Sequence, residues 1–108
     1  MIRRIALLSL AASAALFAQD NGDWHREFPA FRIAGNLYYV GTADLAIYLV
    51  NTPQGNIVIN SNFKQDLPAL KKSIESLGFK YGDTKILLIS HAHGDHDEGT
   101  GIIQHFWP

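Results

Sequence analysis

The stretch His91-Ala92-His93-Gly94-Asp95-His96 is the part of this sequence that most restricts its fold. Three of its side chains are imidazoles and one is a carboxylate, a set of donors that suits zinc. A nearly unbroken apolar run, residues 85–90, comes directly before it and predicts a central strand covered on both faces. We therefore expect a metal site at the C-terminal end of a buried strand.

The spacing of the donors indicates two metal ions. On an extended strand end His91 and His93 point the same way, so both can reach one ion. Asp95 and His96 follow where the chain turns towards a helix, and we expect them to serve a second, adjacent ion. Two ions about 3.5–4 Å apart can activate water and stabilise a leaving group. Gly94 is expected to permit a tight turn between the two pairs.

Other polar residues near the motif receive structural interpretations. His25 and His105 are each isolated from further metal-binding residues, so neither is expected to be a ligand. Asp97 and Glu98 are acidic residues at the predicted start of a helix, where they interact favourably with the helix dipole. Residues 99–103 are expected to begin that helix.

The sequence before the motif predicts a meander of antiparallel strands. Residues 24–31 are aromatic-rich and predict an irregular entry segment. Strands rich in β-forming residues are predicted at residues 36–40, 45–51 and 56–60. Residues 52–55 contain proline and glycine in an order typical of a tight turn between the last two strands.

A helix is predicted over residues 67–77, because apolar side chains recur there at helical spacing. Asp66 is the predicted N-cap, Pro68 lies in the first turn and Gly78 is expected to end the helix. The apolar positions that define the spacing are Leu67, Leu70, Ile74 and Leu77.

Composition excludes several classes of protein. The chain has 108 residues, enough for at most one domain, and 47% of them are hydrophobic, as expected for a folded protein. It contains no cysteine, which excludes disulfides, thiolate ligands and a lipoprotein-type anchor. The net charge is −1 and there is no basic patch, so no nucleic-acid partner is expected.

The first 18 residues predict a secretory signal peptide. Arg3 and Arg4 precede an apolar run with small residues, and cleavage is expected after Ala15 or Ala18. The run is too short for a comfortable membrane span. We therefore expect export to a bacterial periplasm, with no membrane anchor after cleavage.

The motif from His91 to His96 resembles the signature of the metallo-β-lactamase superfamily. Upstream segments, including residues 35–42 and 52–57, resemble the start of the third subclass of class B β-lactamases. In the first subclass an arginine usually stands where His96 is, so this histidine agrees with the third. The resemblance runs from about Trp24 to Ile103.

This resemblance implies an α+β fold, with residues 19–108 forming the N-terminal half of a four-layer αββα sandwich. It implies two zinc ions, one held by His91 and His93 and the other by Asp95 and His96. A zinc-held hydroxide would attack the amide carbonyl of a β-lactam antibiotic, and Asp95 would act as the catalytic residue that orients it. The implied function is therefore antibiotic resistance by a zinc-dependent hydrolase.

The resemblance also implies one further histidine for each zinc, and only His105 follows the motif. We therefore expect a truncated chain that is inactive on its own. Two alternatives stay open: another hydrolase of the superfamily, such as a lactonase or a glyoxalase II-like thioesterase, and a non-functional fragment that binds metal weakly. The sequence leaves the oligomeric state open.

Overall fold

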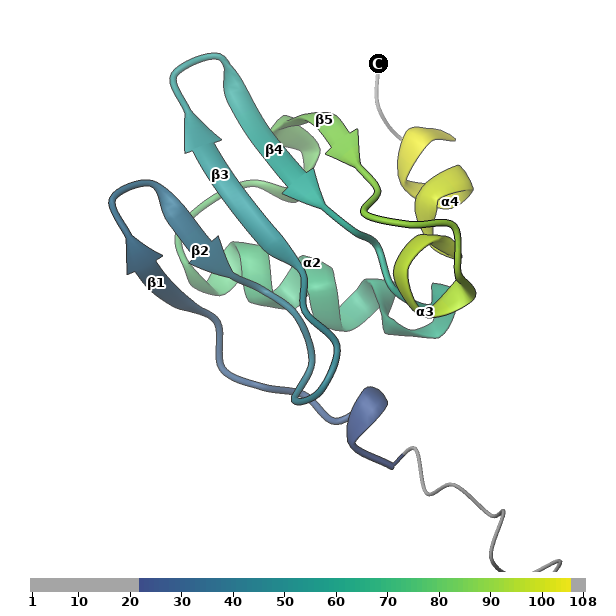
Figure 1. The fold of residues 1–108 in the computed structure, drawn as a ribbon. Helices are drawn as coiled ribbons and strands as arrows, with labels where there is room; N and C mark the ends of the chain where they lie inside the picture. The colour runs from purple at the N-terminus through teal and green to yellow at the C-terminus, as the bar shows by residue number, and fades with distance from the viewer. Residues whose placement is uncertain (1–21, 106–108) are drawn as a thin grey trace, which may run out of the picture.

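Five strands form one mixed sheet in the computed structural model, which describes residues 22–105 (Figure 1). They lie in the sheet in chain order, and neighbours from β1 to β4 are antiparallel. The predicted meander is confirmed, and β1 is a strand that the sequence pattern did not predict. The strands are β1 (Phe31–Ala34), β2 (Leu37–Tyr39), β3 (Tyr48–Thr52), β4 (Gly55–Ile59) and β5 (Thr84–Leu88).

The connection from β4 to β5 contains the main helix. β5 pairs with β4 in parallel, an arrangement that requires a crossover between the two strands. The crossover comprises η2 (Lys64–Asp66), α2 (Leu67–Ser76) and η3 (Tyr81–Asp83). The predicted helix is confirmed as α2. It has proline in its first turn, and Gly78 follows it in the left-handed region, with φ 87°.

The hydrophobic core lies between the sheet and α2, which covers one face of the sheet (Figure 1). Strand, loop and helix residues meet there, and α4 (Thr100–His105) adds the buried Ile103 and the partly buried Ile102. This core joins the metal-motif region to the sheet. Its buried members are Val40, Ile47, Leu49, Val58, Leu67, Leu70, Ile74 and Ile103.

The opposite face of the sheet is open at β5. Ile86 and Leu88 are 47% and 50% exposed, and β5 is the last strand of the sheet. Among residues 22–105, β5 is therefore an edge strand covered on one face, and the predicted cover on its second face is not part of the described structure. An apolar run shows that the side chains of a strand favour burial, but the segments that bury them belong to the rest of the fold.

Asp66 is the residue before α2, as predicted, but its side chain makes no capping hydrogen bond. Instead each of its carboxylate oxygens lies 3.0 Å from Nδ1 of His25, which follows η1 (Gly22–Trp24). The contact between His25 and Asp66 therefore links the segment after η1 to the start of α2.

The predicted signal peptide, residues 1–18, lies outside the described residues. Within residues 22–105, no helix combines the length and the apolar character needed to cross a membrane.

Candidate metal centre

The predicted ligands lie on the chain that leaves the C-terminal end of β5. After Leu88 the chain is irregular to residue 93 and then forms the single turn of α3 (Gly94–Asp97). We call residues 89–98 the metal loop. The backbone carbonyl of His93 accepts hydrogen bonds from the amides of His96 (2.8 Å) and Asp97 (3.0 Å), which closes the turn.

Three of the four predicted ligands come together in this loop. One donor atom each from His91, Asp95 and His96 lies within 4.8 Å of the other two. Oδ2 of Asp95 is 3.2 Å from Nε2 of His96, and the rings of His91 and His96 have centroids 4.0 Å apart. Two imidazoles and one carboxylate at this separation can converge on a metal ion.

His93 is the predicted ligand that stands outside this group. Its ring lies edge-on beside that of His91, with centroids 4.8 Å apart. The prediction that His91 and His93 bind one ion assumed an extended strand through both residues. However, β5 ends at Leu88 and the chain bends before it reaches them. The described arrangement is therefore three donors together and one beside them, not two separate pairs.

The burial of the donors changes along the motif. His91 and His93 are exposed, while Asp95 and His96 are half-buried. Nδ1 of His96 is buried and has no hydrogen-bond partner among residues 22–105. Histidines that bind metal normally use both ring nitrogens, one for the ion and one for a hydrogen bond. The donor chemistry therefore fits zinc, and the surroundings of His96 are incomplete within the described chain.

Glycine has a different role in this loop from the one predicted. Gly94 has no positive φ, and a Cβ there would have no neighbour within 4 Å, so the turn does not require glycine. At Gly99 a Cβ would lie 2.8 Å from Cδ2 of Leu67 and 3.2 Å from the Ser61 carbonyl oxygen. The glycine at which a side chain would be crowded is the one where the metal loop ends against the β4–α2 connection.

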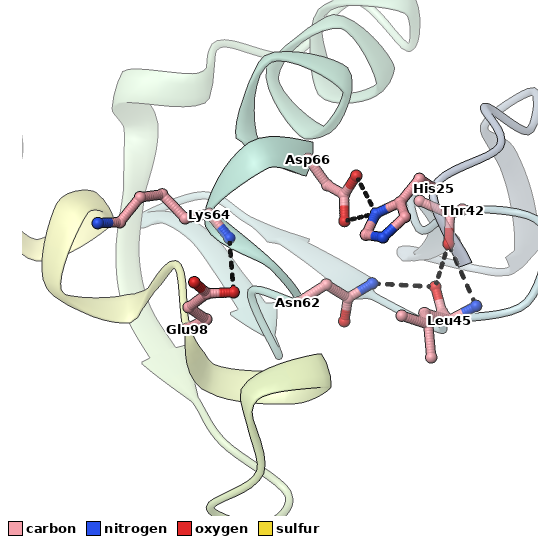
Figure 2. A network of polar contacts seen from close by, with 7 residues as sticks. All are labelled: His25, Thr42, Leu45, Asn62, Lys64, Asp66 and Glu98. Atoms are coloured by element: carbon pink, nitrogen blue, oxygen red, sulfur yellow. Dashed lines mark hydrogen bonds and ion pairs between the residues drawn. The ribbon is translucent and has the colours of Figure 1, made fainter. Parts of the chain in front are cut away.

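Two further polar predictions can be compared with the structure. His25 is not a member of the donor group in the metal loop. Its ring contacts the Asp66 carboxylate, as Figure 2 shows. The carboxylate of Glu98 accepts a hydrogen bond from the Lys64 amide (3.4 Å), at the start of η2. Glu98 thus supports the start of a helix, as an acidic residue was expected to do, but of η2 and not of the helix that follows it.

Comparison with known proteins relates this site to solved enzymes. No protein-family model matches the chain. The native FEZ-1 metallo-β-lactamase from Legionella gormanii is 61% identical, with a TM-score of 0.75, over 76% of this chain and 31% of that one. By sequence and fold, the chain belongs to the class B3 metallo-β-lactamases. The described α+β sheet and helices match the N-terminal part of the metallo-β-lactamase fold.

Two other metallo-β-lactamases support the same relationship. LRA-12, a class B3 di-zinc enzyme from an Alaskan soil metagenome, is 48% identical over 82% of this chain and 33% of its own, with a TM-score of 0.78. GOB-18 from Elizabethkingia meningoseptica is 50% identical over 82% and 32%, with a TM-score of 0.73. The chain thus spans about a third of the length of these relatives.

Proposed function

We propose that this sequence is the metal-binding N-terminal part of a zinc-dependent β-lactamase that hydrolyses the β-lactam amide bond and so confers antibiotic resistance. The observation that carries the proposal is the convergence of His91, Asp95 and His96 in a chain 61% identical to the FEZ-1 enzyme. When bound, zinc supplies Lewis acidity and lowers the pKa of coordinated water.

We assign the four donors to two zinc ions. His91 and His93 would hold one ion, and Asp95 and His96 would hold the other. Asp95 would also be the catalytic carboxylate that orients the attacking water. The contact between Asp95 and His96 supports their assignment to one ion. The assignment of His91 and His93 to the other ion rests on their spacing in the sequence and on the family resemblance.

A chimera tests whether this sequence supports β-lactam hydrolysis. Residues 22–103 would replace the matching segment of the FEZ-1 enzyme, and hydrolysis of a penicillin and a carbapenem would be followed with zinc present. Chelator-sensitive hydrolysis is expected, and the same chimera with Asp95→Asn should lose most of it. A folded, zinc-loaded chimera that cleaves lactones or thioesters but no β-lactam would favour the alternative hydrolases.

The chain by itself is proposed to be inactive. A catalytic zinc is typically held by three protein ligands, so two ions need more donors than the four of this motif. The purified full chain with added zinc should hydrolyse a β-lactam no faster than buffer does. Chelator-sensitive hydrolysis above that background would contradict the proposal.

We also propose export to the periplasm, with cleavage of residues 1–18. The arginine pair and the apolar run of that segment support this assignment. N-terminal sequencing of protein recovered from the periplasm of an expressing bacterium should begin at residue 16 or 19. Exported protein that retained Met1 would contradict it.

A further inference from the structure

The segment between β4 and η2, residues 60–63, lies directly against the metal loop, and we call it the connector. The carbonyl oxygen of His96 accepts hydrogen bonds from the amides of Ser61 (2.8 Å) and Asn62 (3.2 Å). The carbonyl oxygen of Asn62 in turn accepts one from the Gly99 amide (3.1 Å). The connector therefore holds the chain at the last ligand of the motif and again three residues later.

The connector also holds the other end of the metal loop. The amide of Asn60 donates to the carbonyl oxygen of Leu88 (2.7 Å), and its side-chain Oδ1 accepts from the amide of Ser90 (2.9 Å). The loop that carries the ligands thus leaves the connector at Ser90 and returns to it at His96. Its path between these points is short, and both ends are fixed.

Two asparagines give the connector its shape. Asn60 and Asn62 have φ values of 72° and 53°, in the left-handed region that residues other than glycine seldom adopt. Asparagine tolerates this region better than most residues. Alternation of backbone conformation of this kind can direct successive amides to one acceptor, as in anion-binding nests. Here the amides of Ser61 and Asn62 meet the carbonyl oxygen of His96.

The side chain of Asn62 connects the connector to a second loop, residues 40–47, which joins β2 to β3. It is fully buried, and its Nδ2 donates to the carbonyl oxygen of Leu45 at 3.1 Å (Figure 2). The Leu45 end of that loop is itself held, because the Thr42 amide donates to the Leu45 carbonyl (3.0 Å) and the Leu45 amide donates to Thr42 Oγ1 (3.2 Å). The hydroxyl of Tyr39 donates to the Thr42 carbonyl (2.5 Å).

Core packing alone does not account for an asparagine at this position. Oδ1 of Asn62 is buried without a hydrogen-bond partner among residues 22–105. A buried acceptor without a partner is unfavourable, and an apolar side chain of similar size would avoid this penalty. The amide group is explained by its bond to Leu45 and by its tolerance of the left-handed backbone.

We propose that Asn62 is a positioning residue of the metal centre. Its backbone fixes His96 and Gly99, and its side chain anchors them to Leu45, so that the His96 ring lies beside Asp95 before a metal arrives. The effect on zinc affinity rests on the proposed function, whereas the effect on the order of the metal loop does not.

Two substitutions in the full chain separate the backbone role of Asn62 from its side-chain role. Asn62→Gly removes the bond to Leu45 and keeps the left-handed backbone favourable. Asn62→Ala removes the same bond and also makes the left-handed backbone less favourable. Asn36→Ala is the matched control, because Nδ2 of Asn36 makes the same kind of bond, to the carbonyl of Asn51 at 2.9 Å, outside the metal loop.

Zinc affinity is the first measurement, by competition with a chromophoric chelator. Loss of a group that orients a ligand typically weakens metal binding by about 10–100-fold. We expect that range for Asn62→Ala, a smaller loss for Asn62→Gly, and a change below about threefold for the control. Wild-type affinity in both Asn62 variants would overturn the proposal.

Amide hydrogen exchange of the zinc-free chain is the second measurement. Ser90, His96 and Gly99 should exchange about tenfold faster in both Asn62 variants, while α2 keeps its protection and the control resembles the wild type. Equal loss of protection in α2 and the metal loop would overturn a positioning role. A wild-type chain that bound no zinc would contradict the proposed function, while the exchange pattern would still decide the role of Asn62.

Discussion

Asp95 and His96 are adjacent in sequence, and their side chains meet at α3 with Oδ2 and Nε2 3.2 Å apart. This contact joins a carboxylate and an imidazole of the candidate metal centre directly. Asp97 lies two residues after Asp95 in the same turn and is also half-buried, but it is not a member of the donor group. The two aspartates therefore differ in position and not in chemistry.

Asp95→Asn should weaken zinc binding by at least about tenfold, because a neutral amide is a poorer zinc ligand than a carboxylate. Asp97→Asn, the matched control, should bind zinc within about threefold of the wild type. Chelator competition measures both affinities. Equal losses in the two variants would show that net charge, rather than coordination by Asp95, determines the affinity.

Gly99→Ala should lower the free energy of unfolding by about 1–3 kcal/mol, because the added methyl would overlap Leu67 and the Ser61 carbonyl. Gly101→Ala introduces the same methyl in α4 where nothing lies within 4 Å, and should raise stability by up to about 1 kcal/mol. Urea denaturation of both variants checks the difference. A stable Gly99→Ala variant would contradict the close packing of the metal loop on the connector.

At the scale of elements, the N-terminal segment is attached to α2 by side chains far apart in sequence. His25 contacts Asp66 across 41 positions, and the rings of Trp24 and His25 both lie against Phe63. The carboxylate of Asp66 is only 7% exposed, so this contact is more shielded from water than a surface ion pair. The same end of α2 adjoins the connector.

His25→Ala should lower the free energy of unfolding by about 1 kcal/mol, because the buried carboxylate of Asp66 loses its partner. Arg26→Ala removes the neighbouring exposed ion pair with Asp23 and should change stability by less than about 0.5 kcal/mol. Urea denaturation near neutral pH compares the two. Similar effects would mean that the His25 contact is no more protected than a surface pair.

At the scale of the whole molecule, the described sheet has one covered face and one open face. Ile57 and Ile59 of β4 pair in register with Ile86 and Leu88 of β5, so these four side chains lie on the face away from α2. Half-exposed apolar side chains at an unpaired strand edge favour self-association. We propose that the second sheet implied by the family resemblance covers this face.

Ile86→Lys should reduce self-association of the isolated chain without lowering its stability, because Ile86 is 47% exposed and a charge on an edge strand opposes pairing. Leu87→Lys is the matched control on the next residue, whose side chain packs against the core. It should destabilise the fold by about 1–3 kcal/mol, since it replaces a partly buried apolar side chain that packs on the core with a charged one. Light scattering and urea denaturation test both, and undiminished scattering for Ile86→Lys would contradict this account.

Local pattern was sufficient for much of the fold. The meander, α2 and the position of the metal motif were predicted, because side-chain periodicity, turn residues and glycine depend on neighbours in sequence. β1 was missed because Phe31–Ala34 is only four residues long and adjoins a segment that was predicted to be irregular. The strand predicted from residue 45 begins only at Tyr48, because Thr42 and Leu45 close a loop by hydrogen bonds before it.

The sequence by itself determined which donors this protein offers to a metal, because imidazole and carboxylate chemistry belongs to the residues themselves. The tertiary structure alone decided that His91 joins Asp95 and His96, that a side chain would be crowded at Gly99 and not at Gly94, and that Asn62 bonds to both His96 and Gly99. These outcomes depend on how the β4–α2 connector returns against residues about thirty positions later. Contacts of that kind arise from packing and cannot be read from local spacing.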